Sequence, residues 1–292
     1  MARKRRSADR ILLRREIQHQ LESKDATVLQ VAFRKLEAFA DDLGLDKATS
    51  VRLAALLDEE QPEWVRERTA SCLAKIGVNR HTVGHVLASL RDKDSTIRDS
   101  ACQALGMSRV RESGVRLRQL ALRDPDEHVR FSGFEALALI GDVSLKGMIP
   151  HGLSDDSGLV RLATVRALRT VHQSGHLSQK KTRALMQRHL VSEQDPLVRV
   201  ESWNLLHQLG DDHALSQLLE LAGHTQGLVR WQSYEALSGV ADCGNFRNIL
   251  KTLRQLRRLE PSARARRHIL ALTGEVESRF GGNGPSASWS LS

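Results

Sequence analysis

The sequence has few cysteines, few prolines and few aromatic residues. Its 292 residues include 3 Cys and 6 Pro, and Phe, Trp and Tyr together make up 4%. Three cysteines without a Cys-x-x-Cys spacing argue against a disulfide framework and predict reduced thiols, which are typical of a cytoplasmic protein. The scattered prolines leave no Pro-rich linker that would divide the chain.

A long uninterrupted apolar segment is also missing. A membrane-spanning helix needs about 20 consecutive apolar residues. The basic run Arg3-Lys4-Arg5-Arg6 is followed by Arg14 and Arg15, not by the apolar stretch of a signal peptide. The sequence therefore predicts a cytoplasmic protein with no membrane partner.

The motifs of familiar enzyme classes do not occur in the sequence. It has no Gly-rich phosphate loop, no Gly-x-Ser-x-Gly and no His-Glu-x-x-His. Two histidine pairs, His81 with His85 and His172 with His176, have the i, i+4 spacing of metal ligands, but no third ligand stands at a suitable spacing. These observations predict no catalytic residue, no metal site and no cofactor, and hence a protein that is not an enzyme.

Positive charge is abundant but unevenly distributed. The net charge is +9. Residues 1–57 carry 12 Lys and Arg against 8 Asp and Glu, and residues 244–280 carry 9 against 3. The intervening residues 58–243 are close to neutral, with 23 against 24. The two ends are therefore the places where an acidic partner or a nucleic acid would be attracted.

A short pattern recurs along the chain at intervals of 31–38 residues. Each copy has a polar turn, then Val or Ile followed by Arg, then small or apolar residues four, seven and eight positions after the Val or Ile. Degenerate copies flank the six clear ones, at Val28 and in the stretch from Arg264 to Leu272. The Val or Ile of the six clear copies are Val65, Ile97, Val129, Val160, Val198 and Val229.

Helix geometry explains the pattern. Positions 1, 5, 8 and 9 of the copy fall on one face of a helix with 3.6 residues per turn, and small residues at position 5 permit close helix packing. Acids in the preceding turn are suited to cap the helix, and glycines such as Gly77, Gly106, Gly141 and Gly210 to end it. The cysteines Cys72 and Cys102 fall at or beside core positions, which favours a packing role over a nucleophilic one.

The consensus Asp-x-x-Val-Arg-x-x-Ala-x-x-Ala-Leu-x-x-x-Gly resembles the HEAT-like repeats of bilin lyases and of bacterial HEAT-repeat adaptor proteins. The resemblance covers about residues 25–275 and implies that the Arg after Val is structural, pairing with an acid in an adjacent turn. The arginines concerned are Arg66, Arg98, Arg130, Arg161, Arg199 and Arg230.

The expected fold is all-α: a right-handed α-solenoid of about seven to eight HEAT-like helix pairs over residues 11–280. Residues 1–10 are expected to form a basic flexible tail and residues 281–292 a disordered tail.

The first functional hypothesis is a binding scaffold, adaptor or regulator. The resemblance implies that the Val-Arg helices line the concave surface, and position 3 of these helices changes from polar to apolar in the second half of the chain. An exposed apolar stripe of this kind would bind a peptide or a helix of another protein, unless position 3 is buried under the adjacent turn. The predicted partner-binding residues are Phe131, Leu162, Arg166, Val200, Asn204, Trp231 and Glu235.

Two alternatives remain open. The basic ends could bind DNA or RNA, chiefly through a basic face over residues 245–260 and the arginines that follow. Less favoured is an enzyme, either lyase-like or DNA glycosylase-like, with Trp203, Tyr234 and Glu235 as participants. The predicted nucleic-acid-binding residues are Arg247, Lys251, Arg254, Arg258, Arg264 and Arg267.

Overall fold

The computed structural model describes residues 2–43 and 46–280, and all the secondary structure in these ranges is helical. Contacts between Cα atoms divide the chain into two compact units, Met1–His176 and Leu177–Ser292. Each unit is a stack of helix pairs, so the prediction of an all-α solenoid is confirmed. The described residues form sixteen α-helices, which agrees with the predicted seven to eight pairs.

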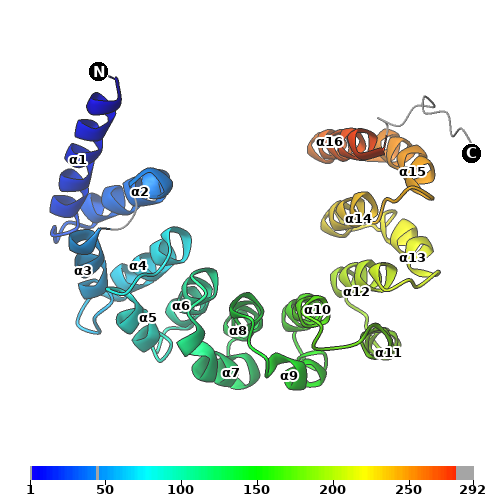
Figure 1. The fold of residues 1–292 in the computed structure, drawn as a ribbon, viewed down its shortest axis with the longest axis horizontal. Coiled ribbons are helices and arrows are strands. Elements are labelled where there is room, and N and C mark those ends of the chain that lie inside the picture. The colour runs from blue at the N-terminus through cyan, green and yellow to red at the C-terminus, as the bar shows by residue number, and fades with distance from the viewer. Residues whose placement is uncertain (1, 44–45, 281–292) are drawn as a thin grey trace, which may run out of the picture. The chain divides into compact units, whose positions relative to one another are not determined.

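The first unit contains ten of these helices. Their bounds are α1 (Ala2–Gln20), α2 (Ala26–Leu43), α3 (Lys47–Ala55), α4 (Glu63–Ile76), α5 (Val83–Ser89), α6 (Ser95–Met107), α7 (Gly114–Arg123), α8 (Glu127–Ile140), α9 (Leu145–Gly152) and α10 (Gly158–Gln173). A short 3-10 helix, η1 (Arg111–Ser113), precedes α7. Helices α4, α6, α8 and α10 pack side by side in one layer, and α5, α7 and α9 form the other (Figure 1).

The second unit contains the remaining six helices. Their bounds are α11 (Gln179–Leu190), α12 (Pro196–Gln208), α13 (Ala214–Leu221), α14 (Gly227–Gly239), α15 (Phe246–Leu259) and α16 (Ala263–Phe280). Here α12, α14 and α16 pack in one layer, and α11, α13 and α15 form the other layer (Figure 1). Within each unit the helices that carry the Val-Arg pattern form one layer, named below the Val-Arg layer of that unit.

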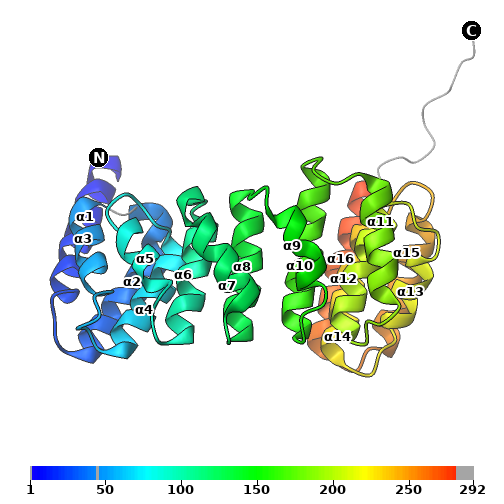
Figure 2. The ribbon, with the colours of Figure 1, turned by 90° about the horizontal axis from the view of Figure 1, so that it is seen from below.

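Small residues at position 5 of the pattern allow the two layers to approach closely. Gly133 of α8 packs against Ala121 of α7, and an added Cβ at Gly133 would lie 2.9 Å from the backbone of Ala121. Helices α7 and α8 lie alongside one another in the view of Figure 2. At three copies position 5 is a Ser or Thr whose hydroxyl donates to the carbonyl of position 1, as Thr164 does to Val160 at 2.7 Å and as Thr69 and Ser233 do in their helices. The hydroxyl is thus satisfied inside the core.

Three of the Val-Arg helices begin with the predicted cap chemistry, whereas α4, α10 and α14 have no side-chain cap. Asp94, Asp126 and Asp195 accept from backbone N–H groups at the start of α6, α8 and α12. Gly141 ends α8 with a positive φ of 70°, which glycine adopts without a steric penalty. Gly106 departs from the prediction, since it lies inside α6 and touches Ala136 of α8, where an added Cβ would lie 2.7 Å from a backbone atom.

Arginines of the Val-Arg pairs tie two successive turns together at four places in the chain. Nη1 of Arg98 donates to the carbonyls of Asp92 (2.9 Å) and Lys93 (3.0 Å), while its Nε and Nη2 donate to the two carboxylate oxygens of Asp124 (2.9 and 2.8 Å). Two-point, charge-assisted bonds of this kind fix orientation as well as adding energy. The prediction of a structural role is confirmed for four pairs: Arg66–Asp92, Arg98–Asp124, Arg130–Asp155 and Arg230–Glu260.

Arg199 of α12 breaks this series. The acid of the following turn is replaced by His224, whose Nδ1 accepts the backbone N–H of Gln226 at 3.1 Å, as Asp124 accepts that of Asp126 at 3.0 Å. The Nε of Arg199 is buried without a hydrogen-bond partner. A buried donor that is left unsatisfied costs free energy, so this is a weak point between α12 and α14.

His224→Asp is therefore expected to stabilise the protein. A carboxylate at position 224 would accept from Arg199 as the other repeat acids do, and hydrogen bonds to charged groups contribute about 1.5–3 kcal/mol. Urea denaturation followed by circular dichroism measures the change in the free energy of unfolding. In the Arg199→Met background the same substitution should give no gain, because the double-mutant cycle removes the interaction; an equal gain there would contradict the explanation.

Tails were expected at both ends of the chain. The expected flexible tail over residues 1–10 is instead helical from Ala2 onward, as the first part of α1, since Arg, Lys and Ala have high helix propensities. The expected disordered tail, residues 281–292, lies outside the described residues. No helix in the described ranges is both long enough and apolar enough to cross a membrane.

Candidate functional site

A cluster of polar and aromatic side chains lies on the Val-Arg layer of the second unit. The indole of Trp231 stacks on the imidazole of His268, with ring centroids 3.8 Å apart and an interplanar angle of 3°. The guanidinium of Arg264 lies over the Trp231 ring at 5.7 Å from its centroid. Nε1 of Trp231 donates to Oε1 of Glu235 at 2.9 Å. These four residues are named below the Trp231 cluster.

Helix packing explains how the Trp231 cluster forms. Trp231 and Glu235 are one turn apart on α14, so their side chains meet on the same face. Arg264 and His268 are likewise four residues apart on α16, which packs against α14. Glu235 joins the helices, because its Oε1 also lies 3.3 Å from Nε2 of His268. The result is a half-buried indole held in place by three neighbours, with an exposed carboxylate beside it.

The predicted exposed apolar stripe is wrong at two of its four residues. Leu162 is 6% exposed and Val200 1% exposed, so both are core residues. Adjacent Val-Arg helices approach closely enough to cover position 3, as the alternative interpretation had it. Phe131 and Trp231 are half-buried.

The predicted partner-binding residues are divided between the two units. Phe131, Leu162 and Arg166 belong to the first unit, where Nη1 of Arg166 lies 3.4 Å from Oε1 of Glu135. Val200, Asn204, Trp231 and Glu235 belong to the second unit. Sequence analysis missed His268 and placed Arg264 only in the nucleic-acid set. Nothing in the repeat register marked His268 as a partner of Trp231.

The residues considered for a glycosylase-like site do not converge. Tyr234 is buried, whereas Glu235 is exposed, and the hydroxyl of Tyr234 donates to Oε2 of Glu260 at 2.7 Å. Burial and the neighbouring carboxylate raise the pKa of Tyr234. Trp203 packs against the core of the second unit, and its Nε1 is buried without a hydrogen-bond partner. These contacts are structural.

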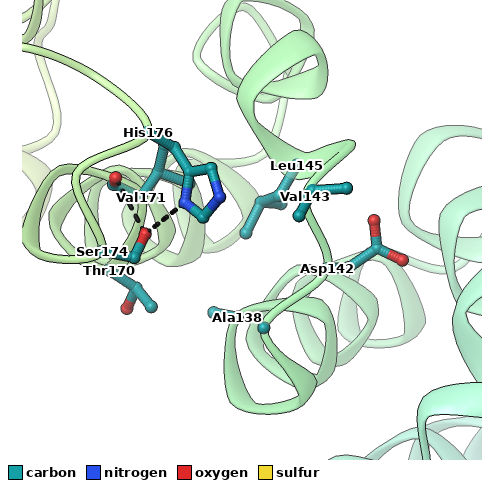
Figure 3. Close-up of a pocket in the computed structure, with 9 residues that line it drawn as sticks. Ala138, Asp142, Val143, Leu145, Thr170, Val171, Ser174 and His176 are labelled. Carbon is teal, nitrogen blue, oxygen red and sulfur yellow. Dashed lines mark hydrogen bonds between the residues drawn. The ribbon is translucent and has the colours of Figure 1, made fainter.

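A serine and a histidine meet in a small cavity of about 60 Å³ between the α8–α9 loop and the end of α10 (Figure 3). Oγ of Ser174 lies 2.7 Å from Nδ1 of His176 and donates to the carbonyl of Val171 at 3.0 Å. Because a hydroxyl has one proton, Nδ1 of His176 must be the donor to Oγ. This arrangement closes the helix end and does not activate the serine. Asp142 points away from the pair, toward Arg118.

Neither histidine pair lies on one helix, as the i, i+4 spacing would require for a shared face. His81 precedes α5, which begins at Val83, so it does not share a helix face with His85. His172 lies near the end of α10, and the chain then turns at Gly175, whose φ is 76°, before reaching His176. In the described ranges no group of three or more His, Cys, Asp or Glu side chains is placed to hold a metal ion.

The core positions of two cysteines are confirmed. Cys72 and Cys102 are fully buried. Burial raises the pKa of the Cys72 thiol to about 12 and also raises that of Cys102. Both thiols are therefore protonated near neutral pH and do not serve as nucleophiles.

The basic residues of α15 and α16 lie at the surface of the second unit. Arg247, Lys251, Arg254 and Arg258 are exposed along α15, as are Arg264 and Arg267 on α16. The predicted basic face of α15 is thus present. Nη2 of Arg254 is 2.5 Å from Oε1 of Glu277. Arg254 and Arg258 also line a groove with two arginines outside the predicted set, Arg257 and Arg266.

The repeat pattern has a counterpart in a known family. The model of the HEAT repeats matches residues 49–138, 84–169 and 145–238, which together cover more than half of the chain. The chain belongs to the HEAT-repeat family.

One curated relative of this HEAT-repeat chain is an enzyme subunit. The phycocyanobilin lyase subunit alpha of Picosynechococcus sp. is 29% identical over 156 residues, which is 48% of this chain and 58% of the relative. The chain thus matches less than two thirds of that relative's length. This finding overturns the prediction that the protein is not an enzyme, because the relative is part of a lyase.

Two solved structures resemble this HEAT-repeat chain in fold. The complex of CpcE and CpcF of phycocyanin lyase from Nostoc sp. matches with 20% identity and a TM-score of 0.49, covering 89% of this chain and 93% of that chain. The Escherichia coli protein YibA matches with 18% identity and a TM-score of 0.52, covering 90% and 91%. At these identities the likeness concerns the fold alone.

Proposed function

We propose that this chain is a HEAT-repeat subunit of a lyase-type enzyme assembly and that it holds a segment of a protein partner against the Trp231 cluster. The relative supports the enzymatic context, since it is a subunit of a phycocyanobilin lyase. The observation that carries the binding role is the half-buried Trp231 on the Val-Arg layer, whose ring is contacted by His268 and Arg264.

The Trp231 cluster has the properties of a binding hot spot. Binding energy at protein interfaces concentrates in Trp, Tyr and Arg side chains that are rigid before binding. Trp231 is ordered by its stacking and its hydrogen bond, so a partner would lose little side-chain entropy from it. Exposed Glu235 and Arg264 flank the ring with opposite charges, which suits a segment that carries both apolar and polar groups.

Site-specific crosslinking tests this proposal. The photoreactive residue p-benzoylphenylalanine is placed at position 228, where Leu228 is 59% exposed one turn before Trp231 on α14, or at Val191, which is 85% exposed between α11 and α12. After irradiation in the host cell, position 228 should give a discrete crosslinked protein. Trp231→Ala should reduce its yield at least about tenfold, as expected for loss of a hot-spot residue.

The control and a second readout make the result decisive. Position 191 should give no such product, and equal crosslinking there would count against a site at the cluster. The partner identified in the crosslinked product is then purified in its free form. It is offered phycocyanobilin in the presence of the chain, and covalent attachment is followed by absorbance. A partner that is captured but never modified would support holding and argue against the lyase context.

A further inference from the structure

A groove lined by arginines runs between α15 and α16 of the second unit. Its walls include Arg254, Arg257 and Arg258 from α15 and Arg266, Leu270 and Gly274 from α16. The acid in the groove, Glu277, is engaged with Arg254. The groove is separate from the Trp231 cluster, with which it shares no residue. Its positive charge is therefore largely unneutralised by its own lining.

Arg266 occupies the place in its repeat that Arg66, Arg98, Arg130 and Arg230 occupy in theirs. Its Nη1 donates to the carbonyls of Glu260 (2.8 Å) and Pro261 (2.9 Å), six and five residues earlier. Arg230 makes the same contacts with His224 (3.0 Å) and Thr225 (2.8 Å). The guanidinium of Arg266 is thus held in the same orientation as those of the other repeat arginines.

Arg230 and Arg266 differ in what binds their two remaining guanidinium donors, Nε and Nη2, which are called the fork below. Nε and Nη2 of Arg230 bind both oxygens of the Glu260 carboxylate, at 2.8 and 3.0 Å. Arg266 has no such carboxylate among the described residues, although its Nη1 is bound in the same way. Nε and Nη2 of Arg266 are therefore available to an acid that another molecule supplies.

We propose that the groove between α15 and α16 binds an acidic segment of a protein partner, with an Asp or Glu carboxylate of the partner chelated by Nε and Nη2 of Arg266. The carboxylate takes the position that Asp124 takes at Arg98 and that Glu260 takes at Arg230. Arg257 and Arg258 attract further acids in the same segment. The site is independent of the function proposed above.

The lining of the groove favours a protein over a nucleic acid. Single-stranded nucleic acids are bound by aromatic side chains on which bases stack, and the groove lining contains no aromatic residue. The aromatic residues at the ends of α15 and α16, Phe246 and Phe280, stack on each other at 5.3 Å. Leu270, 49% exposed, offers an apolar contact that suits an amphipathic peptide.

A fluorescence-anisotropy titration tests the assignment with the full chain. The probe is a fluorescein-labelled peptide with the sequence of residues 120–133, which contains the Asp124 that Arg98 chelates within the fold. We expect saturable binding at low salt. Asp124→Asn in the peptide should weaken binding about tenfold, because the neutral amide offers the arginine fork one acceptor oxygen where the carboxylate offers two.

Variants of the chain distinguish the two-point hydrogen bonding by Arg266 from the effect of positive charge alone. Arg266→Lys keeps the charge but loses the two-point geometry, and we expect about tenfold weaker binding. Lys251→Ala removes one charge from α15 outside the groove and should change the affinity less than twofold. Circular dichroism shows whether each variant keeps its helical content. Arg257→Ala with Arg258→Ala should weaken binding severalfold.

Three outcomes would overturn the proposal. The first is that the peptide fails to bind. The second is that Lys251→Ala weakens binding as much as Arg266→Lys, which would mean that the surface attracts the peptide only through its overall positive charge. The third outcome is tested with a labelled 15-nucleotide oligothymidylate. If this oligonucleotide binds more tightly than the peptide and is displaced by the groove substitutions, the surface is a nucleic-acid site.

Discussion

Glu260→Ala is expected to lower the free energy of unfolding of the second unit by about 3–5 kcal/mol, the usual cost of breaking a buried ion pair by removing one partner. The side chain of Glu260 is 1% exposed and accepts from Arg230 and from the hydroxyl of Tyr234. Its removal leaves a partly buried guanidinium without a counter-ion and a buried phenol without an acceptor. Urea denaturation followed by circular dichroism measures the loss.

The acid dependence of stability gives a second readout of the same residue. The hydrogen bonds from Arg230 hold the pKa of Glu260 at about 2, below its ordinary value of 4.5. A depressed carboxyl pKa contributes stability above the ordinary pKa, and that stability is lost as pH falls toward the folded-state value. Between pH 5 and pH 2 the wild type should therefore lose more stability than Glu260→Gln.

Glu275→Ala is the matched control, because Glu275 is an exposed acid on α16, the helix that follows Glu260. Surface substitutions usually change stability by no more than about 0.5 kcal/mol. A comparable loss in both variants, or an unaltered acid dependence in Glu260→Gln, would contradict the assigned role of Glu260.

Gly152→Ala is expected to destabilise the first unit by about 3 kcal/mol, at the upper end of the usual cost of overpacking a core. Gly152 ends α9, and an added Cβ would lie 2.3 Å from Oγ1 of Thr164 and 2.6 Å from Cζ of Phe134. Both neighbours are fully buried. Thermal and urea denaturation of the purified variant measure the effect.

Gly147→Ala in the same helix is the control with the opposite sign. An added Cβ at Gly147 meets nothing within 4 Å. Ala is favoured over Gly in a helix interior by about 0.8–1 kcal/mol, so this variant should be slightly more stable than the wild type. If both substitutions had the same sign, steric contact at Gly152 would not be the cause.

Periodicity was enough to identify the repeats. The Val-Arg pattern marks the start of α4, α6, α8, α10, α12 and α14 because every copy must bury the same face against its neighbours. Cys72 and Cys102 were assigned to the core on the same ground. The structural role of the repeat arginines was predicted from the family resemblance. Arg98, for example, pairs with an acid of the next turn as that resemblance implied.

Exposure at position 3 could not be derived from periodicity. Leu162 and Val200 have the same helical phase as Trp231, yet they are buried and Trp231 is half-buried. The helical phase gives the direction of a side chain relative to its own helix axis. Whether a neighbouring helix covers that direction depends on the distance and angle between the two helices.

The sequence by itself determined the helical repeats, the Val-Arg layer and the charge of α15 and α16, because these depend on local spacing and composition. Only the tertiary structure decided which charges are neutralised and which are available. Arg230 and Arg266 make the same contacts with the carbonyls six and five residues earlier, but Glu260 binds the remaining donors of Arg230 while Arg266 lines a groove with other arginines. That difference depends on contacts between residues about 30 apart, which no local pattern records.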